Sequence, residues 1–161
     1  EIVQPLRKQF RVVGYFEGAS RDELQCWASL TDQWWPQPAG DLGDKLEAGF
    51  ARAFLDDRPV MAIGTDCLDL DAALVQQAAV LLEAHDVVFG PAHDGGYYLV
   101  GTRQNLPNFF SDVTWSSPET LRSHRAVCQR NAWSVATLPT LRDIDTWEDW
   151  QAHCLDRVEF K

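Results

Sequence analysis

The stretch VMAIGTDCLDLD, from Val60 to Asp71, constrains the fold more than any other part of this chain. It opens with apolar or small residues, and acids follow at Asp66 and Asp69. An apolar run that ends in acids is typical of a buried strand that stops where the chain reaches solvent. In open α/β sheets ligands bind just beyond the carboxyl ends of the strands, so these acids are candidates to hold a hard divalent cation. The same pattern also fits a turn capped by Asp66 and a helix capped by Asp69 or Asp71.

Strand and helix patterns alternate along the rest of the chain. Runs rich in β-formers or apolar residues predict strands at 10–16, 60–64, 86–91, 97–101 and 133–138, with a short extended piece at 34–38. Helix starts are indicated at Ser20, after Gly43, at Asp71, at the Ser-x-x-Glu string Ser116–Glu119 and at Thr146. This alternation implies an α/β fold with a mainly parallel sheet and right-handed crossovers. The 161 residues suffice for one domain with its own core.

The net charge of −10 argues against a general nucleic-acid or anionic-membrane surface, because both need a basic face. A nucleotide ligand still fits, since a bound cation can carry its phosphates. The four cysteines form no CxxC pair, which argues against zinc or a disulfide framework and leads us to expect a cytoplasmic protein. No stretch is apolar enough to span a membrane.

Further acids and glycines mark other candidate positions. Asp143 and Asp145 fall on one side of an extended segment, where they could share a Mg²⁺ or Mn²⁺ with Asp66 if both clusters lie at one sheet edge. For Asp145 alone, a place at a helix N-terminus explains the charge equally well. Asp94, in the string HDGG, fits either a general base or a turn-capping residue. The glycine-containing loop before residue 46 is a weak phosphate or base signal, since it matches neither the P-loop nor the dinucleotide fingerprint.

Five strings, in this order, resemble those of one family: PQPAGDLGDKLEAGFARAF, VMAIGTDCLDLDAALVQQA, DVVFGPAHDGGYYLVG, VTWSSPETL and LPTLRDIDTWEDW. Over residues 10–150 the chain resembles the radical-SAM/selenodomain-associated transferases, also described as arsenosugar-biosynthesis-type glycosyltransferases. The resemblance implies the glycosyltransferase-A fold of nucleotide-diphospho-sugar transferases. That fold is a three-layer αβα arrangement with a mainly parallel sheet, here in one domain over residues 1–161.

The resemblance also implies a nucleotide-sugar site with Mg²⁺ or Mn²⁺ at the carboxyl edge of the sheet. Asp66 resembles the leading acid of an Asp-x-Asp-type metal motif, and Asp145 resembles the distal metal acid of a DVDTPED-like string. In the family one segment reads the nucleotide base. The residues of this chain that resemble it are Gln37, Gly40, Leu42 and Gly43. The residues that resemble the acceptor or sugar side of the family's pocket are Asp94, Gly95, Gly96 and Tyr97. Asp94 would then be the base that deprotonates the acceptor hydroxyl.

The chain departs from the family at its beginning. Family members start with a strand and a basic phosphate-binding loop of the KTRL type, and this chain contains no such string. In this fold that strand lies in the middle of the sheet, so its absence would leave neighbouring strands with unpaired backbone groups. We therefore expect that the domain is N-terminally truncated, or that another segment or a partner chain fills the gap. A homo-oligomer is one way to fill it.

Three functions fit these patterns. The main expectation is a metal-dependent transferase that moves a sugar from a nucleotide-diphospho-sugar to a small-molecule acceptor. A nucleotidyltransferase that releases pyrophosphate is the alternative on the same scaffold, because fold alone does not separate the two. The third is a non-catalytic nucleotide-sugar binding or assembly module that has lost the phosphate loop.

Overall fold

The computed structural model of the chain describes residues 3–144, 147 and 150–151. Within these residues the strands form a two-stranded and a four-stranded sheet. The smaller sheet pairs β1 (Val13–Phe16) in parallel with β2 (Gln33–Pro36). The larger sheet consists, in spatial order, of β3 (Val60–Ile63), β5 (Tyr97–Thr102), β4 (Val87–Pro91) and β6 (Val135–Thr137).

Strand directions confirm the α/β class and identify β5 as the exception within the larger sheet. Both β3 and β4 pair antiparallel with β5, and β4 pairs in parallel with β6, so β3, β4 and β6 share one direction. The reason is the short connection at 92–96 between β4 and β5. A turn of this length joins only antiparallel neighbours, whereas a parallel neighbour needs a crossover of a dozen residues or more.

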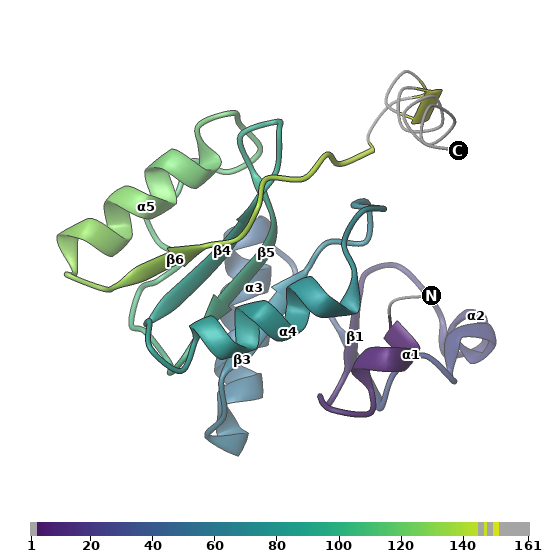
Figure 1. The fold of residues 1–161 in the computed structure, drawn as a ribbon. Helices are drawn as coiled ribbons and strands as arrows, with labels where there is room; N and C mark the ends of the chain where they lie inside the picture. The colour runs from purple at the N-terminus through teal and green to yellow at the C-terminus, as the bar shows by residue number, and fades with distance from the viewer. Residues whose placement is uncertain (1–2, 145–146, 148–149, 152–161) are drawn as a thin grey trace.

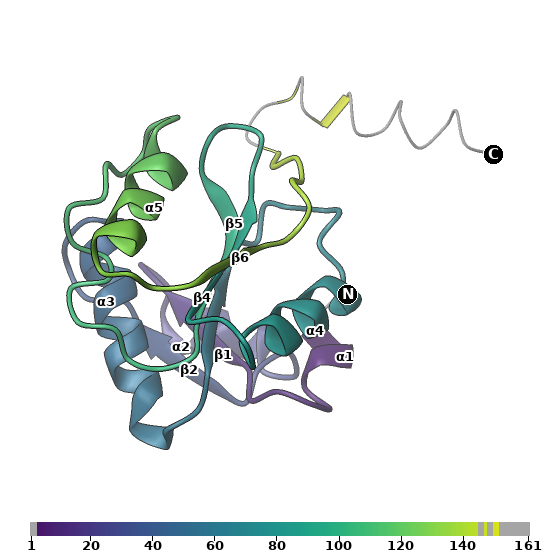
Figure 2. The ribbon, with the colours of Figure 1, turned by 60° about the vertical axis from the view of Figure 1, so that its left-hand side comes forward.

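Helices cover both faces of the sheets, which gives the expected three layers (Figure 2). On one face lie α3 (Leu42–Ala53) and α5 (Thr120–Arg130), and on the other lie α1 (Val3–Leu6) and α4 (Ala72–Leu81). The short α2 (Arg21–Leu24) continues into the 3₁₀ turn η1 (Gln25–Trp27), and α3 continues into η2 (Phe54–Asp56).

The core follows the alternation of side chains along β4, whose five residues are all buried. Phe89 packs with Phe50 of α3 and with Phe109 and Phe110 on one face, and Val88 belongs to the cluster under α4 on the other. Burial on both faces explains why the sequence of β4 is an unbroken apolar run.

Several predicted boundaries differ from the structure. Ser20 does cap a helix with the reciprocal bonds of a capping box to Glu23, but that α-helix is a single turn. The extended piece expected at 34–38 overlaps β2. It is a strand because it pairs with β1. The capping box expected at Ser116 was wrong: α5 begins at Thr120, and Glu119, the residue just before it, pairs with Arg122 instead. The helix expected from Thr146 lies largely outside the described residues.

Both β1 and β3 have an open edge within the described residues. β1 pairs only with β2, β3 pairs only with β5, and every residue of the two strands is half-buried. The same helices nevertheless cover both strands. Tyr15 of β1 donates a hydrogen bond to the Lys45 carbonyl of α3 (2.7 Å), and Val60 and Ala62 of β3 pack in the cluster that contains Phe50 of α3. The two sheets therefore share their helical layers without a ladder between them.

Candidate functional site

The carboxyl ends of β3 and β4 meet at one edge of the larger sheet. Ile63 and Gly90, near the ends of β3 and β4, both pair with Leu99 of β5, and Leu141 beyond β6 bridges to Ala92. The loops that follow Ile63, Pro91 and β6 therefore lie together at this edge, drawn uppermost in Figure 1. α3 leads down to η2 and the amino end of β3, so its first turn also lies at the carboxyl edge.

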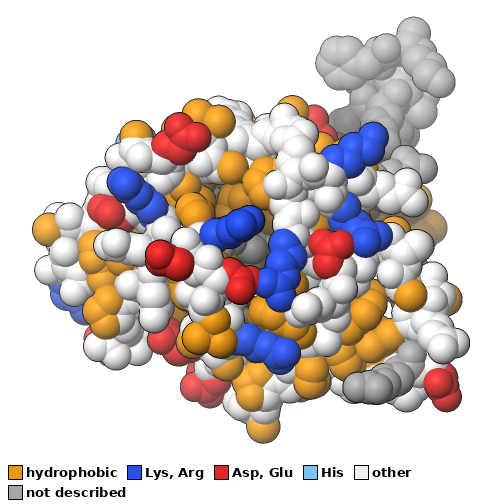
Figure 3. All heavy atoms as spheres, turned by 90° about the horizontal axis from the view of Figure 1, so that it is seen from below, with side chains coloured by type: hydrophobic (Ala, Val, Ile, Leu, Met, Phe, Trp, Pro, Cys, Tyr) orange, Lys and Arg blue, Asp and Glu red, His pale blue; other side chains and the backbone are white. Residues whose placement is uncertain are grey.

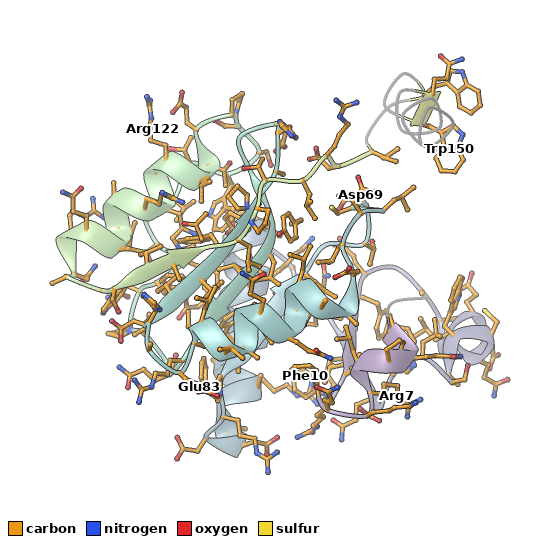
Figure 4. All side chains as sticks on the ribbon, viewed as in Figure 1. Arg7, Phe10, Asp69, Glu83, Arg122 and Trp150 are labelled. Atoms are coloured by element: carbon orange, nitrogen blue, oxygen red, sulfur yellow. The ribbon has the colours of Figure 1, made fainter. Side chains whose placement is uncertain are left out.

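Asp66 lies in the first of these loops, directly against the segment that carries Asp143. The backbone N–H of Ile144 donates to the Asp66 carbonyl (3.0 Å), and the Cys67 thiol donates to the Arg142 carbonyl (3.5 Å). Burial raises the pKa of the Cys67 thiol. Asp66 is exposed, and Asp69 lies on the same loop, above α4 in Figure 4. The two acidic segments singled out in the sequence therefore do meet at one edge.

The acids at this edge provide some, but not all, of the ligands that a divalent cation needs. Within the described residues there is no cluster of three or more His, Cys, Asp or Glu side chains that could hold a metal ion. Asp145, the second expected metal acid, lies outside the described residues, next to Ile144. Mg²⁺ sites in phosphate-binding enzymes need only one or two carboxylates, because phosphate oxygens and water complete them. The exposed Asp66 carboxylate could supply one of these ligands.

Asp94 caps the turn between β4 and β5. Its Oδ1 accepts a hydrogen bond from the Gly96 N–H (2.7 Å), the turn-capping role that the sequence left open. Gly95 has a φ of 92°, and a Cβ there would collide with the backbone of Pro118. The Gly95 carbonyl accepts from the Leu121 N–H (3.0 Å), so the turn is joined to the start of α5. Asp94 itself is exposed at the sheet edge.

The segment from Gln37 to Gly43 connects β2 to the first turn of α3. Gln37 donates from its backbone to the Phe16 carbonyl (2.7 Å) and from its side chain to the Tyr15 carbonyl (3.1 Å). Both groups are therefore engaged by the end of β1. Gly40 adopts a φ of 130°, a conformation that L side chains rarely adopt. Leu42 is exposed.

Gly43 is buried beneath an indole ring. A Cβ on Gly43 would lie 2.5 Å from the Trp115 ring nitrogen, so the absence of a side chain lets Trp115 pack on the first turn of α3. Next to this contact is an open hollow of about 240 Å³ with Trp115 and Phe110 in its wall. Acids at the start of α3, Asp41 and Asp44, form its other side.

Tyr97 packs among the rings of Phe89, Trp115 and His124. Its hydroxyl lies 3.3 Å from Nδ1 of His124 on α5, inside the core. Burial raises the pKa of Tyr97 well above its usual range. Sequence inspection missed His124 completely, because a single histidine within a helix carries no local signal. Only the packing of α5 against β4 and β5 places it beside Tyr97.

Comparisons with known proteins identify the family. The family described as "Uncharacterized protein conserved in bacteria (DUF2064)" matches residues 5–117. The chain belongs to the DUF2064 family. A search of curated proteins found no match.

Two crystal structures resemble this DUF2064 protein. One, described as a "putative nucleotide-diphospho-sugar transferase" from Desulfovibrio desulfuricans G20, matches with a TM-score of 0.74 and 28% identity over 83% of this chain and 61% of that one. The other is a homolog of Mycobacterium tuberculosis rv0371c from Mycobacterium sp. strain JC1. It matches with a TM-score of 0.61 and 12% identity over 99% of this chain and 83% of that one, and shares the fold.

The DUF2064 protein thus has the α/β fold of nucleotide-diphospho-sugar transferases, and it spans less than two thirds of the D. desulfuricans protein. The family match covers Asp66, Asp94 and the segment Gln37–Gly43, whereas His124 and Asp145 lie beyond it. No helix of the described residues is long and apolar enough to cross a membrane. The lower face of the molecule, opposite the carboxyl edge, carries several Lys and Arg side chains interspersed with acids (Figure 3).

Proposed function

We propose that this protein binds a nucleotide-diphospho-sugar at the carboxyl edge of its sheet and transfers the sugar to a small-molecule acceptor. The observation that carries the proposal is the 3.0 Å hydrogen bond from Ile144 N–H to the Asp66 carbonyl. It brings the acidic segment after β6 against the acid that follows β3, at the edge where ligands bind in open α/β sheets. The D. desulfuricans relative supports the nucleotide-sugar class.

Asp66 and Asp145 would hold a Mg²⁺ or Mn²⁺ ion, which supplies positive charge to offset that of the diphosphate. The carboxylate of Asp66 is available for this role because it is exposed at the edge. Arg142, exposed in the same segment, adds a positive charge that sequence inspection did not single out. A guanidinium suits phosphate oxygens because it presents paired N–H donors.

Asp94 is our candidate for the base that takes the proton of the acceptor hydroxyl. One carboxylate oxygen is committed to the Gly96 N–H, which fixes the orientation of the side chain, and the exposed carboxylate faces the edge solvent. A carboxylate held by its own turn is oriented without further support, which is what a general base requires. The order of the five motif strings also supports membership of the narrower radical-SAM/selenodomain-associated group, which we retain as part of this proposal.

Calorimetry with a panel of nucleotide-diphospho-sugars in the presence of Mn²⁺ tests the proposal. The wild-type chain should bind at least one member only when Mn²⁺ is present. Asp66→Asn should weaken this binding by more than the roughly 10–100-fold that loss of a group supporting a metal ligand typically costs.

Asp57→Asn is the matched control. Asp57 precedes the amino end of β3, opposite Asp66, and its φ of 49° is one that asparagine tolerates well. This variant should bind like the wild type. Equal affinities for Asp66→Asn and the wild type would reject the metal role of Asp66. Release of pyrophosphate from a nucleoside triphosphate with Mg²⁺ would instead indicate a nucleotidyltransferase, and tight binding without turnover would indicate a binding module.

A further inference from the structure

His124 is the most deeply enclosed polar side chain near the candidate site. It is fully buried and is surrounded by aromatic rings from β4, β5 and the loop after residue 105. The nearest ring centroid is that of Phe109 at 4.3 Å, and the Trp115 ring lies at 6.1 Å. A phenylalanine would fit such surroundings, so the imidazole calls for an explanation.

The polar atoms of His124 are only partly satisfied. Nδ1 faces the Tyr97 hydroxyl at 3.3 Å, and Nε2 has no hydrogen-bond partner within the described residues. A buried nitrogen without a partner lowers stability, because it has lost its bonds to water. The unpartnered Nε2 offsets part of what the contact with Tyr97 contributes, so stability alone does not explain why this position holds an imidazole.

The aromatic rings around His124 connect it to the first turn of α3. The rings of Tyr97 and Trp115 meet edge to face with centroids 6.5 Å apart, and Trp115 in turn lies on Gly43. Phe110 contacts both His124 and Trp115 and shares the wall of the hollow with the indole. A continuous set of ring contacts thus runs from His124 through Tyr97 to Trp115.

We infer that His124 and Tyr97 are positioning residues, which hold Trp115 over the first turn of α3 and thereby fix the ligand-facing segment that ends at Gly43. Their polar groups face each other at 3.3 Å, so their effect on the segment passes through the indole. The effect on ligand binding rests on the proposed function, whereas the effect on Trp115 does not.

The double variant His124→Phe/Tyr97→Phe tests the inference because it removes both polar groups and keeps ring-sized side chains. Replacing both partners of a buried pair by apolar groups of similar shape leaves stability nearly unchanged. In ¹⁵N-labelled protein the indole N–H signal of Trp115, assigned with Trp115→Phe, should shift or broaden while the other indole signals stay in place. Affinity for the nucleotide-sugar with Mn²⁺ should fall by between about threefold and a hundredfold.

Tyr97→Phe alone removes only one hydroxyl and serves as the milder variant, should the double variant not fold. His85→Phe, in the turn between α4 and β4, is the control and should leave the Trp115 signal unchanged. An unchanged Trp115 signal in Tyr97→Phe and in the folded double variant would overturn the inference. A shifted signal in a protein that binds no nucleotide-sugar would support the positioning role and count against the proposed function.

Discussion

His124 and Tyr97 owe their electrostatic state to burial. Burial lowers the pKa of His124 to about 4, and burial raises the pKa of Tyr97. Both side chains are therefore neutral at neutral pH. A neutral imidazole and a neutral hydroxyl can share one proton donor and one acceptor at the observed 3.3 Å contact. Protonation of His124 would place a charge among the aromatic rings that surround it.

A pH-dependent loss of stability follows from this burial. The unfolded chain binds a proton at His124 near pH 6.5, whereas the folded chain does so only near pH 4. The stability that depends on a neutral His124 is therefore present above pH 6.5 and is lost as the pH drops toward 4. The free energy of unfolding should fall by about 2 kcal/mol between pH 7.5 and 5. Urea unfolding at these two pH values measures the loss.

His124→Phe isolates the contribution of this group. The variant should show a smaller loss between pH 7.5 and 5, because its side chain does not titrate. Hydrogen bonds from Ser134 lower the pKa of Asp86. The contribution of Asp86 to folding stability is therefore lost mainly below about pH 5, outside the measured range. The same slope in the variant and the wild type would show that another group causes the loss.

At the scale of elements, the loop from β3 to α4 separates the roles of its acids. Asp71 caps α4, since its Oδ1 accepts the backbone N–H of Leu74 (2.8 Å). Asp66 makes its contact with Ile144 through the backbone and leaves its carboxylate exposed. Two acids five residues apart therefore serve different purposes, one in the helix and one at the sheet edge.

Asp71→Ala should reduce stability without affecting the candidate site. Loss of an N-cap costs about 0.5–2 kcal/mol, because a backbone N–H in the first turn loses its partner. Urea unfolding should show this loss for Asp71→Ala and little change for Asp66→Asn. Calorimetry with Mn²⁺ and nucleotide-sugar should show the reverse order. A loss of metal-dependent binding in Asp71→Ala, at a pH where it is fully folded, would contradict this division.

Local patterns predicted the elements whose signals lie within a few residues of one another. The α4 cap, the buried run of β4 and the turn at Gly95 belong to this group, because cap chemistry, periodicity and turn residues act locally. The Ser116–Glu119 string misled us because a capping box requires helical backbone directly after the serine. Ser116 instead has a φ of 51°, and the Thr120 hydroxyl bonds back to the Thr114 carbonyl.

The candidate site was predictable only in the same local sense. Acids at strand ends could be found in the sequence, and the contact of Ile144 with Asp66 then joined them. His124 and Trp115 could not be found this way, because their roles depend on the packing of α5 and of the loop after residue 105 on β4 and β5. The proposed metal and base roles of Asp66, Asp145 and Asp94 stay predictions.

At the scale of the whole molecule, the described strands form two sheets with no ladder between them. Tyr15 ties β1 to α3, and Phe10 and Val12 pack in the cluster that contains Met61 and Ile63 of β3. The described strands on either side of this region do not pair with each other. We expect another segment or a second copy of the chain to supply a strand here.

Hydrogen exchange on the 161-residue chain tests that expectation. At low protein concentration, amides of β1 and β3 that face away from β2 and β5 should exchange much faster than those of β4 and β5, which are paired on both edges. Slower exchange of these amides at higher concentration, without change in β4, would indicate that a second copy fills the gap. Protection equal to that of β5 at every concentration would contradict the open edges, because it would require a partner strand from the same chain.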